Sequence, residues 1–176
     1  MGLSELICAA VISIGMMNAN YACEHMDLVV SASEENDIEP EVLVALIHVE
    51  SRWTPNAVSH ANACGLTQVI PKWTGGRASA GVRYTCEDLK NPLVSIVAGA
   101  TIFNHWLHRY GRCSTGRCRT SNYMVGLCGY NAGYRCRGDN PNRHGMHYAR
   151  TVLAKSRQIK SAMRRIQNAN RQNRSQ

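Results

Sequence analysis

The segment from Pro40 to Glu50 constrains the fold more than any other part of the chain. Pro40 suits the first turn of a helix, and the acids Glu39 and Glu41 favour the positive end of the helix dipole. A helix that is apolar on nearly all sides has to be surrounded by other elements. We therefore expect a central, buried helix here, because apolar residues occupy almost all of its positions: Val42, Leu43, Val44, Ala45, Leu46, Ile47 and Val49.

The rest of the chain is also helical in pattern, with loops marked by Pro and Gly and no alternating run typical of a strand. We expect helices over about 24–36, 91–111, 121–128 and 144–166, followed by a polar tail at 167–176 that is typical of disorder. No internal repeat and no second domain is visible. The sequence predicts a mainly α-helical single domain.

Charge is distributed unevenly along the chain. Residues 1–50 hold nine of the twelve acids and no Lys or Arg, so their formal charge is −9, whereas the remaining residues carry +17. A basic surface of this kind favours an anionic partner, which could be nucleic acid, acidic lipid or a bacterial envelope polymer. Nucleic acid is disfavoured because the arginines follow no groove-reading motif. Nucleotide chemistry has no support, since a phosphate-binding glycine loop is absent.

The N-terminal segment indicates export. Leu6 to Met17 is a twelve-residue apolar run, too short to span a bilayer and of the right length for the hydrophobic part of a secretion signal. A cut after Ala22 would make residues 1–22 a signal peptide, although no Lys or Arg precedes the run. A buried N-terminal helix is the alternative. No apolar run in the chain is long enough for a stable membrane span.

The eight cysteines support an oxidising compartment, because an even number of cysteines in a small chain favours disulfides. Loss of a signal peptide would remove Cys8, and the pairing of the six cysteines from Cys64 onward stays open. The closest pair, Cys113 and Cys118, misses the usual zinc-ligand spacing, and the seven histidines show no such spacing either. We expect no metal and no cofactor.

Glu50 is the main candidate for chemistry. It follows Ile47, Leu46 and Leu43 by three, four and seven residues, so its carboxyl shares their face at the end of an apolar stripe. Burial disfavours the ionised form of a carboxyl and raises its pKa. Such a group can hold a proton near neutral pH and protonate the leaving oxygen of a glycosidic bond. The alternative is a glutamate that ends its helix and points to water.

Several separated motifs occur in one order around this glutamate: Val49-Glu50-Ser51, Pro55-Asn56-Ala57-Val58-Ser59, Gly65-Leu66-Thr67-Gln68-Val69-Ile70-Pro71, Asn91-Pro92, Tyr130-Asn131-Ala132-Gly133, and Tyr148 with Val152. This order, from about Cys23 to Ile159, resembles the soluble lytic transglycosylase family of lysozyme-like enzymes. The resemblance implies a lysozyme-like catalytic domain over 23–166. The family usually has Met at the position of Thr67 and Ala at that of Gly129, which would affect substrate fit more than activity.

The resemblance implies cleavage of the β-1,4 bond between N-acetylmuramic acid and N-acetylglucosamine in peptidoglycan, with formation of a 1,6-anhydro end. Glu50 would be the single catalytic acid and base. Most glycosidases need a second carboxylate, and few acids follow Glu50 in the chain, although one among residues 24–41 could fold close. The implied substrate-binding residues are Ser51, Gln68, Tyr130, Asn131 and Tyr148. Ser51 could instead cap its helix, and Tyr148 could belong to the core.

Two other functions stay open. One is a hydrolytic muramidase of the same fold, and the other is a non-catalytic component that binds or assembles the cell wall. In each case the implied partner is the peptidoglycan glycan strand. Small relatives of this kind serve secretion or conjugation machines, and others are carried by bacteriophages. We therefore expect an exported protein of the periplasm or cell envelope, or a protein encoded by a phage. A further expected partner is a secretion or conjugation apparatus or a phage particle.

Overall fold

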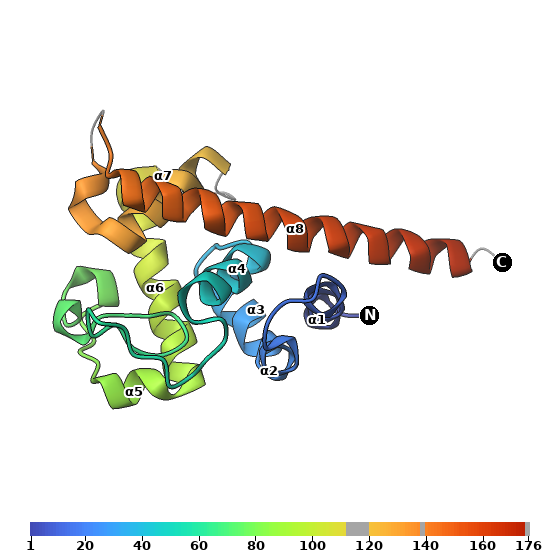
Figure 1. The fold of residues 1–176 in the computed structure, drawn as a ribbon, viewed down its shortest axis with the longest axis horizontal. Helices are drawn as coiled ribbons and strands as arrows, with labels where there is room; N and C mark the ends of the chain where they lie inside the picture. The colour runs from blue at the N-terminus through green and yellow to red at the C-terminus, as the bar shows by residue number, and fades with distance from the viewer. Residues whose placement is uncertain (112–119, 138–139, 175–176) are drawn as a thin grey trace.

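The computed structural model describes residues 1–111, 120–137 and 140–174. In these ranges β-structure is limited to two isolated bridges, Val58 with Cys64 and Cys64 with Val69. The prediction of a mainly α-helical single domain is confirmed (Figure 1). The α-helices are α1 (Leu3–Ser13), α2 (Ala19–Glu24), α3 (Met26–Glu35), α4 (Pro40–Ser51), α5 (Cys86–Lys90), α6 (Pro92–Gly111), α7 (Thr120–Ala132) and α8 (Arg143–Arg174), and the short 3₁₀ turns are η1 (Pro71–Trp73), η2 (Arg77–Ser79) and η3 (Gly133–Cys136).

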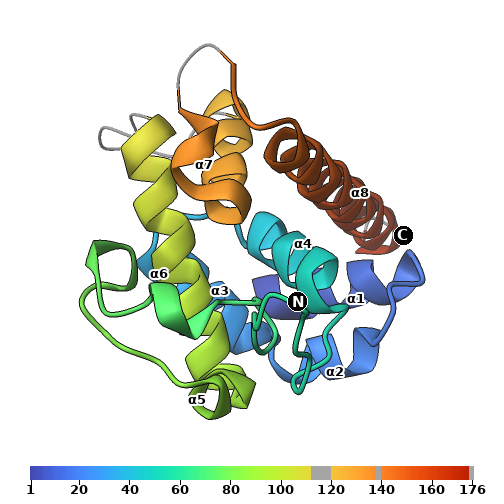
Figure 2. The same cartoon turned by 60° about the vertical axis from the view of Figure 1, so that its left-hand side comes forward.

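Helix α4 lies in the middle of the molecule, between α6 on one side and α8 on the other (Figure 2). Every side chain from Val42 to Ile47 is at most 2% exposed. Each of the larger ones contributes about 2 kcal/mol by leaving water. The start of α4 is also tied to α8, because Lys160 forms ion pairs with Glu39 at 2.8 Å and with Glu41 at 2.9 Å.

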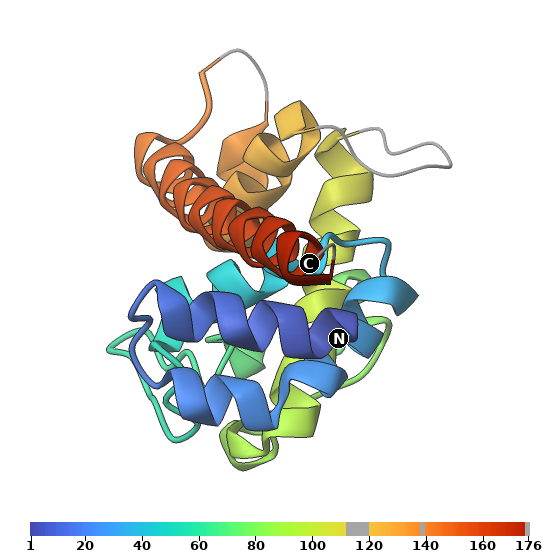
Figure 3. The same ribbon diagram turned by 90° about the vertical axis from the view of Figure 1, so that its right-hand side faces the viewer.

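Helix α1 packs along α8 and beside α2 (Figure 3). Ile7, Ala10 and Val11 are fully buried in this contact, and a disulfide joins Cys8 to Cys23. The N-terminal segment thus forms a helix with one buried face in the folded chain. Its cleavage after Ala22 stays a prediction, and cleavage would uncover these apolar contacts. In the described ranges, no helix has both the length and the apolar character needed to cross a bilayer.

Helix α8 is longer than the sequence pattern indicates. It runs to Arg174, whereas the sequence predicted a helix ending near Ile166 and disorder over 167–176. No Gly or Pro follows Gly145, so nothing in the sequence breaks the helix. The side chains from 167 to 173 are exposed, and this end of α8 extends beyond the body of the domain (Figure 1).

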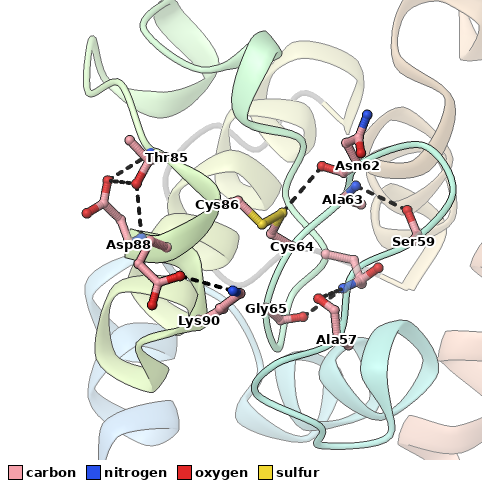
Figure 4. Close-up of a disulfide and its surroundings, with 12 residues drawn as sticks. Ala57, Ser59, Asn62, Ala63, Cys64, Gly65, Thr85, Cys86, Asp88 and Lys90 are labelled. Carbon is pink, nitrogen blue, oxygen red and sulfur yellow. Dashed lines mark hydrogen bonds and ion pairs between the residues drawn. A yellow bond between two sulfur atoms is a disulfide. The ribbon is translucent and has the colours of Figure 1, made fainter.

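Residues 52–90 form a lobe with little regular structure that is held by the disulfide Cys64–Cys86 (Figure 4). A small apolar cluster stabilises it, made of Cys64, Val69, Leu89 and Ala98. Gly65 has a φ of +78°, and a Cβ there would lie 1.8 Å from the carbonyl oxygen of Leu89. Only glycine fits this position.

A third disulfide, Cys128–Cys136, joins α7 to η3. A Cβ on Gly145 of α8 would lie 2.7 Å from the sulfur of Cys128, so the bridge and α8 are in close contact. The other two cysteines of the chain, Cys113 and Cys118, lie outside the described residues.

Candidate functional site

The carboxyl of Glu50 lies in the last turn of α4, where the buried part of that helix ends. Its Oε1 accepts a hydrogen bond of 2.6 Å from the phenol of Tyr148 on α8. Burial raises the pKa of Glu50 from 4.5 to about 7, and the hydrogen bond from Tyr148 opposes this rise. Because burial is the larger effect, a substantial fraction of Glu50 is protonated at neutral pH.

A second phenol, Tyr130 of α7, lies close to the same carboxyl. Its hydroxyl donates to the carbonyl oxygen of Thr67 at 2.7 Å, and its ring packs edge-on against Phe103 of α6. Burial raises the pKa of Tyr130 and Tyr148 well above 10, and the charge of Glu50 adds to both shifts. Three helices and one loop therefore converge at Glu50.

Gln68 belongs to the loop that Tyr130 holds. The backbone of Gln68 is left-handed, with a φ of +51°. Its Nε2 donates to the carbonyl oxygens of Ala57 at 3.1 Å and Gly65 at 2.9 Å. The amide nitrogen of Gln68 is thus used to hold the loop in shape, and the amide oxygen is the group left to meet a ligand.

The remaining two predicted residues, Ser51 and Asn131, differ in their exposure to solvent. Ser51 is buried, and its Oγ donates to the carbonyl oxygen of Ile47 in the preceding turn at 3.2 Å. Its hydroxyl therefore bonds to its own helix. Asn131 follows Tyr130 in the last turn of α7 and its side chain is exposed. The structure brings together Glu50, Tyr130 and Tyr148.

The two positions that differ from the family pattern are packing positions. Thr67 is fully buried and donates to the carbonyl oxygen of Ser95 at 2.7 Å, and a Cβ on Gly99 would lie 2.5 Å from the Cβ of Thr67. The Thr67 side chain therefore fills the contact between the loop and α6.

Gly129 is buried beneath an aromatic pair. A Cβ there would lie 3.0 Å from both Trp106 and Tyr110, whose rings stack at 5.5 Å. Larger aromatic side chains on α6 thus occupy the space next to this glycine. Together with the burial of Thr67, this places both departures in the contacts of α6, and their effect on substrate fit stays a prediction.

Some contributors to the site had no signal in the sequence. The acceptor for Tyr130 is a backbone carbonyl, which a side-chain pattern does not reveal. Arg52 and Trp53 both have positive φ, of 52° and 62°, and this sharp turn ends α4 just after Glu50. The ring of Trp53 is 1% exposed.

Among the described residues, burial and the hydrogen bond from Tyr148 are the causes of the pKa shift of Glu50. The sequence left open that an acid among residues 24–41 folds close to Glu50, and two of these acids, Glu39 and Glu41, pair with Lys160. Glu41 and Glu50 are nine residues apart on α4, which corresponds to about 13 Å along the helix. The same described ranges hold no group of three His, Cys, Asp or Glu side chains suited to a metal ion.

Comparison with known proteins agrees with this architecture. The chain is 41% identical over 54 residues to membrane-bound lytic murein transglycosylase C of Actinobacillus pleuropneumoniae serotype 5b (strain L20), which covers 31% of this chain and 15% of that protein. It is 35% identical over 82 residues to the protein of the same name from Glaesserella parasuis serovar 5 (strain SH0165), covering 44% of this chain and 22% of that one. The chain thus spans less than a quarter of either relative in the matched region.

The fold is similar to that of the 70 kDa soluble lytic transglycosylase from Escherichia coli. The TM-score is 0.64 at 20% identity, and the match covers 91% of this chain and 28% of that protein. The transglycosylase SLT domain family matches residues 27–150, which include Glu50, Gln68, Tyr130 and Tyr148. Because this match covers more than half of the sequence, the chain belongs to the transglycosylase SLT domain family.

Proposed function

We propose that this protein is a peptidoglycan lytic transglycosylase that cleaves the β-1,4 bond between N-acetylmuramic acid and N-acetylglucosamine. The observation that carries the proposal is the carboxyl of Glu50, whose pKa burial raises to about 7. A carboxyl of this acidity can protonate a glycosidic oxygen near neutral pH. Membership of the transglycosylase SLT domain family supports the choice of substrate.

In the first step Glu50 transfers its proton to the bridging oxygen, and the bond from that oxygen to the anomeric carbon of the muramic acid breaks. Positive charge develops on the sugar ring as the leaving group departs with its new proton. Glu50 becomes a carboxylate, and the hydroxyl of Tyr148, 2.6 Å away, stabilises that charged form.

In the second step the carboxylate of Glu50 takes the proton of the C6 hydroxyl of the same muramic acid. The C6 oxygen forms a bond to the anomeric carbon and closes a 1,6-anhydro ring. Glu50 ends the cycle protonated, and no water is consumed. One carboxylate is enough for both steps, which agrees with the engagement of Glu39 and Glu41 by Lys160 elsewhere.

The other predicted residues support these steps in different ways. Tyr130 is a positioning residue that ties the loop of Gln68 to α7 through Thr67. The free amide oxygen of Gln68 and the exposed amide of Asn131 suit hydroxyl and acetamido groups of the glycan. Ser51 helps to hold the last turn of α4, which carries Glu50, through its hydrogen bond to Ile47.

We also propose that the protein acts outside the cytoplasm, in the periplasm or cell envelope. Three disulfides among the described residues support an oxidising compartment. Mass spectrometry of the exported protein tests the cleavage of residues 1–22. A chain that begins at Cys23 supports cleavage, whereas an exported chain that keeps the Cys8–Cys23 bridge contradicts it.

Digestion of purified peptidoglycan followed by mass spectrometry of the released muropeptides tests the activity. Anhydro ends are expected from the native protein and none from Glu50→Gln. Glu34→Gln, which changes an exposed glutamate on α3, is the matched control and should release the same products as the native protein. Reducing ends would identify a hydrolytic muramidase instead, and no release by the native protein would leave only a wall-binding role.

A further inference from the structure

An open surface pocket of about 430 Å³ lies between η2 and α6, and Arg77, His108 and Arg109 are exposed in it. Figure 2 shows the green segment that contains η2 beside α6. One lining residue comes from η2 and five come from α6: Arg77, Thr101, Asn104, His105, His108 and Arg109. Two of the six are arginines and two are histidines, and no acid is among them.

The basic side chains of this pocket act on His105. Burial lowers the pKa of His105, and the charges of Arg109, Arg77 and His108 lower it further. Arg109 also lies over the ring of Tyr134, with 4.8 Å between the guanidinium carbon and the ring centroid, which restricts where its head can go. A pocket lined by two arginines and no acid favours a bound anion, because Arg donates charge-assisted hydrogen bonds to carboxylate and phosphate oxygens.

The pocket lies away from the candidate active site. Thr101, His105 and His108 follow one another at spacings of four and three residues, so they share one face of α6. Phe103, which contacts Tyr130 of the site, lies on the opposite face, since two residues correspond to about 200° of rotation. The pocket is therefore not used by any step proposed for Glu50.

We propose that this pocket is a second binding site, which takes an oxyanion group of a cell-envelope polymer, either a peptide carboxylate or a phosphate. The site holds the polymer through Arg77 and Arg109, with His105, His108 and Thr101 as further hydrogen-bond partners, whereas the amide nitrogen of Asn104 donates to Asn36. The choice of a cell-envelope polymer rests on the proposed function, whereas binding of an oxyanion in the pocket does not depend on cleavage.

NMR titration of the full chain tests the site, with the ring C–H signals of His105 and His108 as reporters. The probes are inorganic phosphate and glutarate, which represent the two sources of the oxyanion. We expect one or both probes to shift these two signals, and Arg77→Gln/Arg109→Gln to weaken binding about tenfold or more. A response to phosphate alone assigns a phosphate polymer, and a response to glutarate alone assigns peptide carboxylates.

The matched control is Arg150→Gln/Arg164→Gln, which removes the same charge from exposed positions on α8. It should bind the probes as the native protein does. Unfolding curves of both double variants establish that they are folded. Absence of a shift with both probes, or equal weakening in the two double variants, would overturn the proposal. Glu50→Gln should leave the titration unchanged, which separates failure of this site from failure of the proposed activity.

Discussion

The phenol of Tyr148 and the carboxyl of Glu50 share a hydrogen bond of 2.6 Å although 98 residues separate them in the chain. Helix α8 crosses α4 at this point and brings the donor to the end of the buried helix. The bond favours the ionised carboxyl and burial favours the neutral one, with burial as the larger effect. The acidity of Glu50 is therefore set by two opposing contributions, which mutation can separate.

Replacement of Tyr148 by Phe removes the contribution that favours ionisation. The pKa of Glu50 should rise further, because the hydrogen bond from Tyr148 lowers it in the native protein. The descending limb of kcat/KM at high pH, where Glu50 loses its proton, should move to higher pH. The rate at the optimum should fall about tenfold, since the carboxylate formed in the first step loses a donor. A limb that moves to lower pH contradicts this account.

Replacement of Glu50 by Gln should change stability in a pH-dependent way. Folded Glu50 keeps its proton up to about pH 7, whereas an unfolded glutamate loses it near 4.5. Between these values the folded state binds more protons, so the native protein loses stability as pH rises. Above pH 7 this pKa shift of Glu50 lowers the free energy of unfolding by about 3 kcal/mol.

Urea unfolding at pH 4 and pH 8 measures this difference. Glu50→Gln should have about the stability of the native protein at pH 4 and exceed it at pH 8. Glu34→Gln, at an exposed site, should follow the native protein at both values. Equal curves for native protein and Glu50→Gln at pH 8 would show that the carboxyl ionises without a burial cost.

Tyr130→Phe tests the link between α7 and the loop of Gln68. It leaves the carbonyl oxygen of Thr67 without its donor, and the loss of such a buried bond costs about 1–2 kcal/mol. Tyr134→Phe removes a hydroxyl from a tyrosine that is 64% exposed and serves as the control. The free energy of unfolding should fall in the first variant and change by less than about 0.5 kcal/mol in the second. Equal changes would mean that the bond does not hold the loop.

The helices could be predicted from the sequence where an apolar pattern dictated burial. Helix α4 was predicted over 40–50, because apolar residues on all sides leave a helix no exposed face, and it occupies Pro40–Ser51. The end of α8 was not predicted. The polar residues after Ile166 are typical of disorder, but no Gly or Pro occurs there to end the helix. The apolar run near the N-terminus forms helix α1 in the folded chain, and its removal as a signal peptide stays a prediction, because one apolar run suits both.

The site could be predicted only in part. The helix face that carries Glu50 follows from the spacing of apolar residues in α4. The hydrogen bond from Tyr148 depends on how α8 packs across α4, and the spacing of residues within one helix does not reveal this packing. Ser51 bonds to Ile47 because a serine in the last turn can reach the carbonyl four residues earlier. The Cys64–Cys86 pair likewise depends on the path of residues 52–90, which lack a periodic pattern.

Gly65→Ala tests whether the lobe needs its close contact with α5. The new Cβ would lie 1.8 Å from the carbonyl oxygen of Leu89 in a backbone with a φ of +78°. The backbone of Leu89 cannot move aside as a flexible side chain can, so the free energy of unfolding of Gly65→Ala should fall by about 3 kcal/mol or more. Gly76→Ala is the matched control, because nothing lies within 4 Å of a Cβ there. Stability to urea and muropeptide release should both fall in Gly65→Ala and stay unchanged in Gly76→Ala, since the loop of Gln68 begins at Gly65. Native stability in Gly65→Ala would contradict the contact.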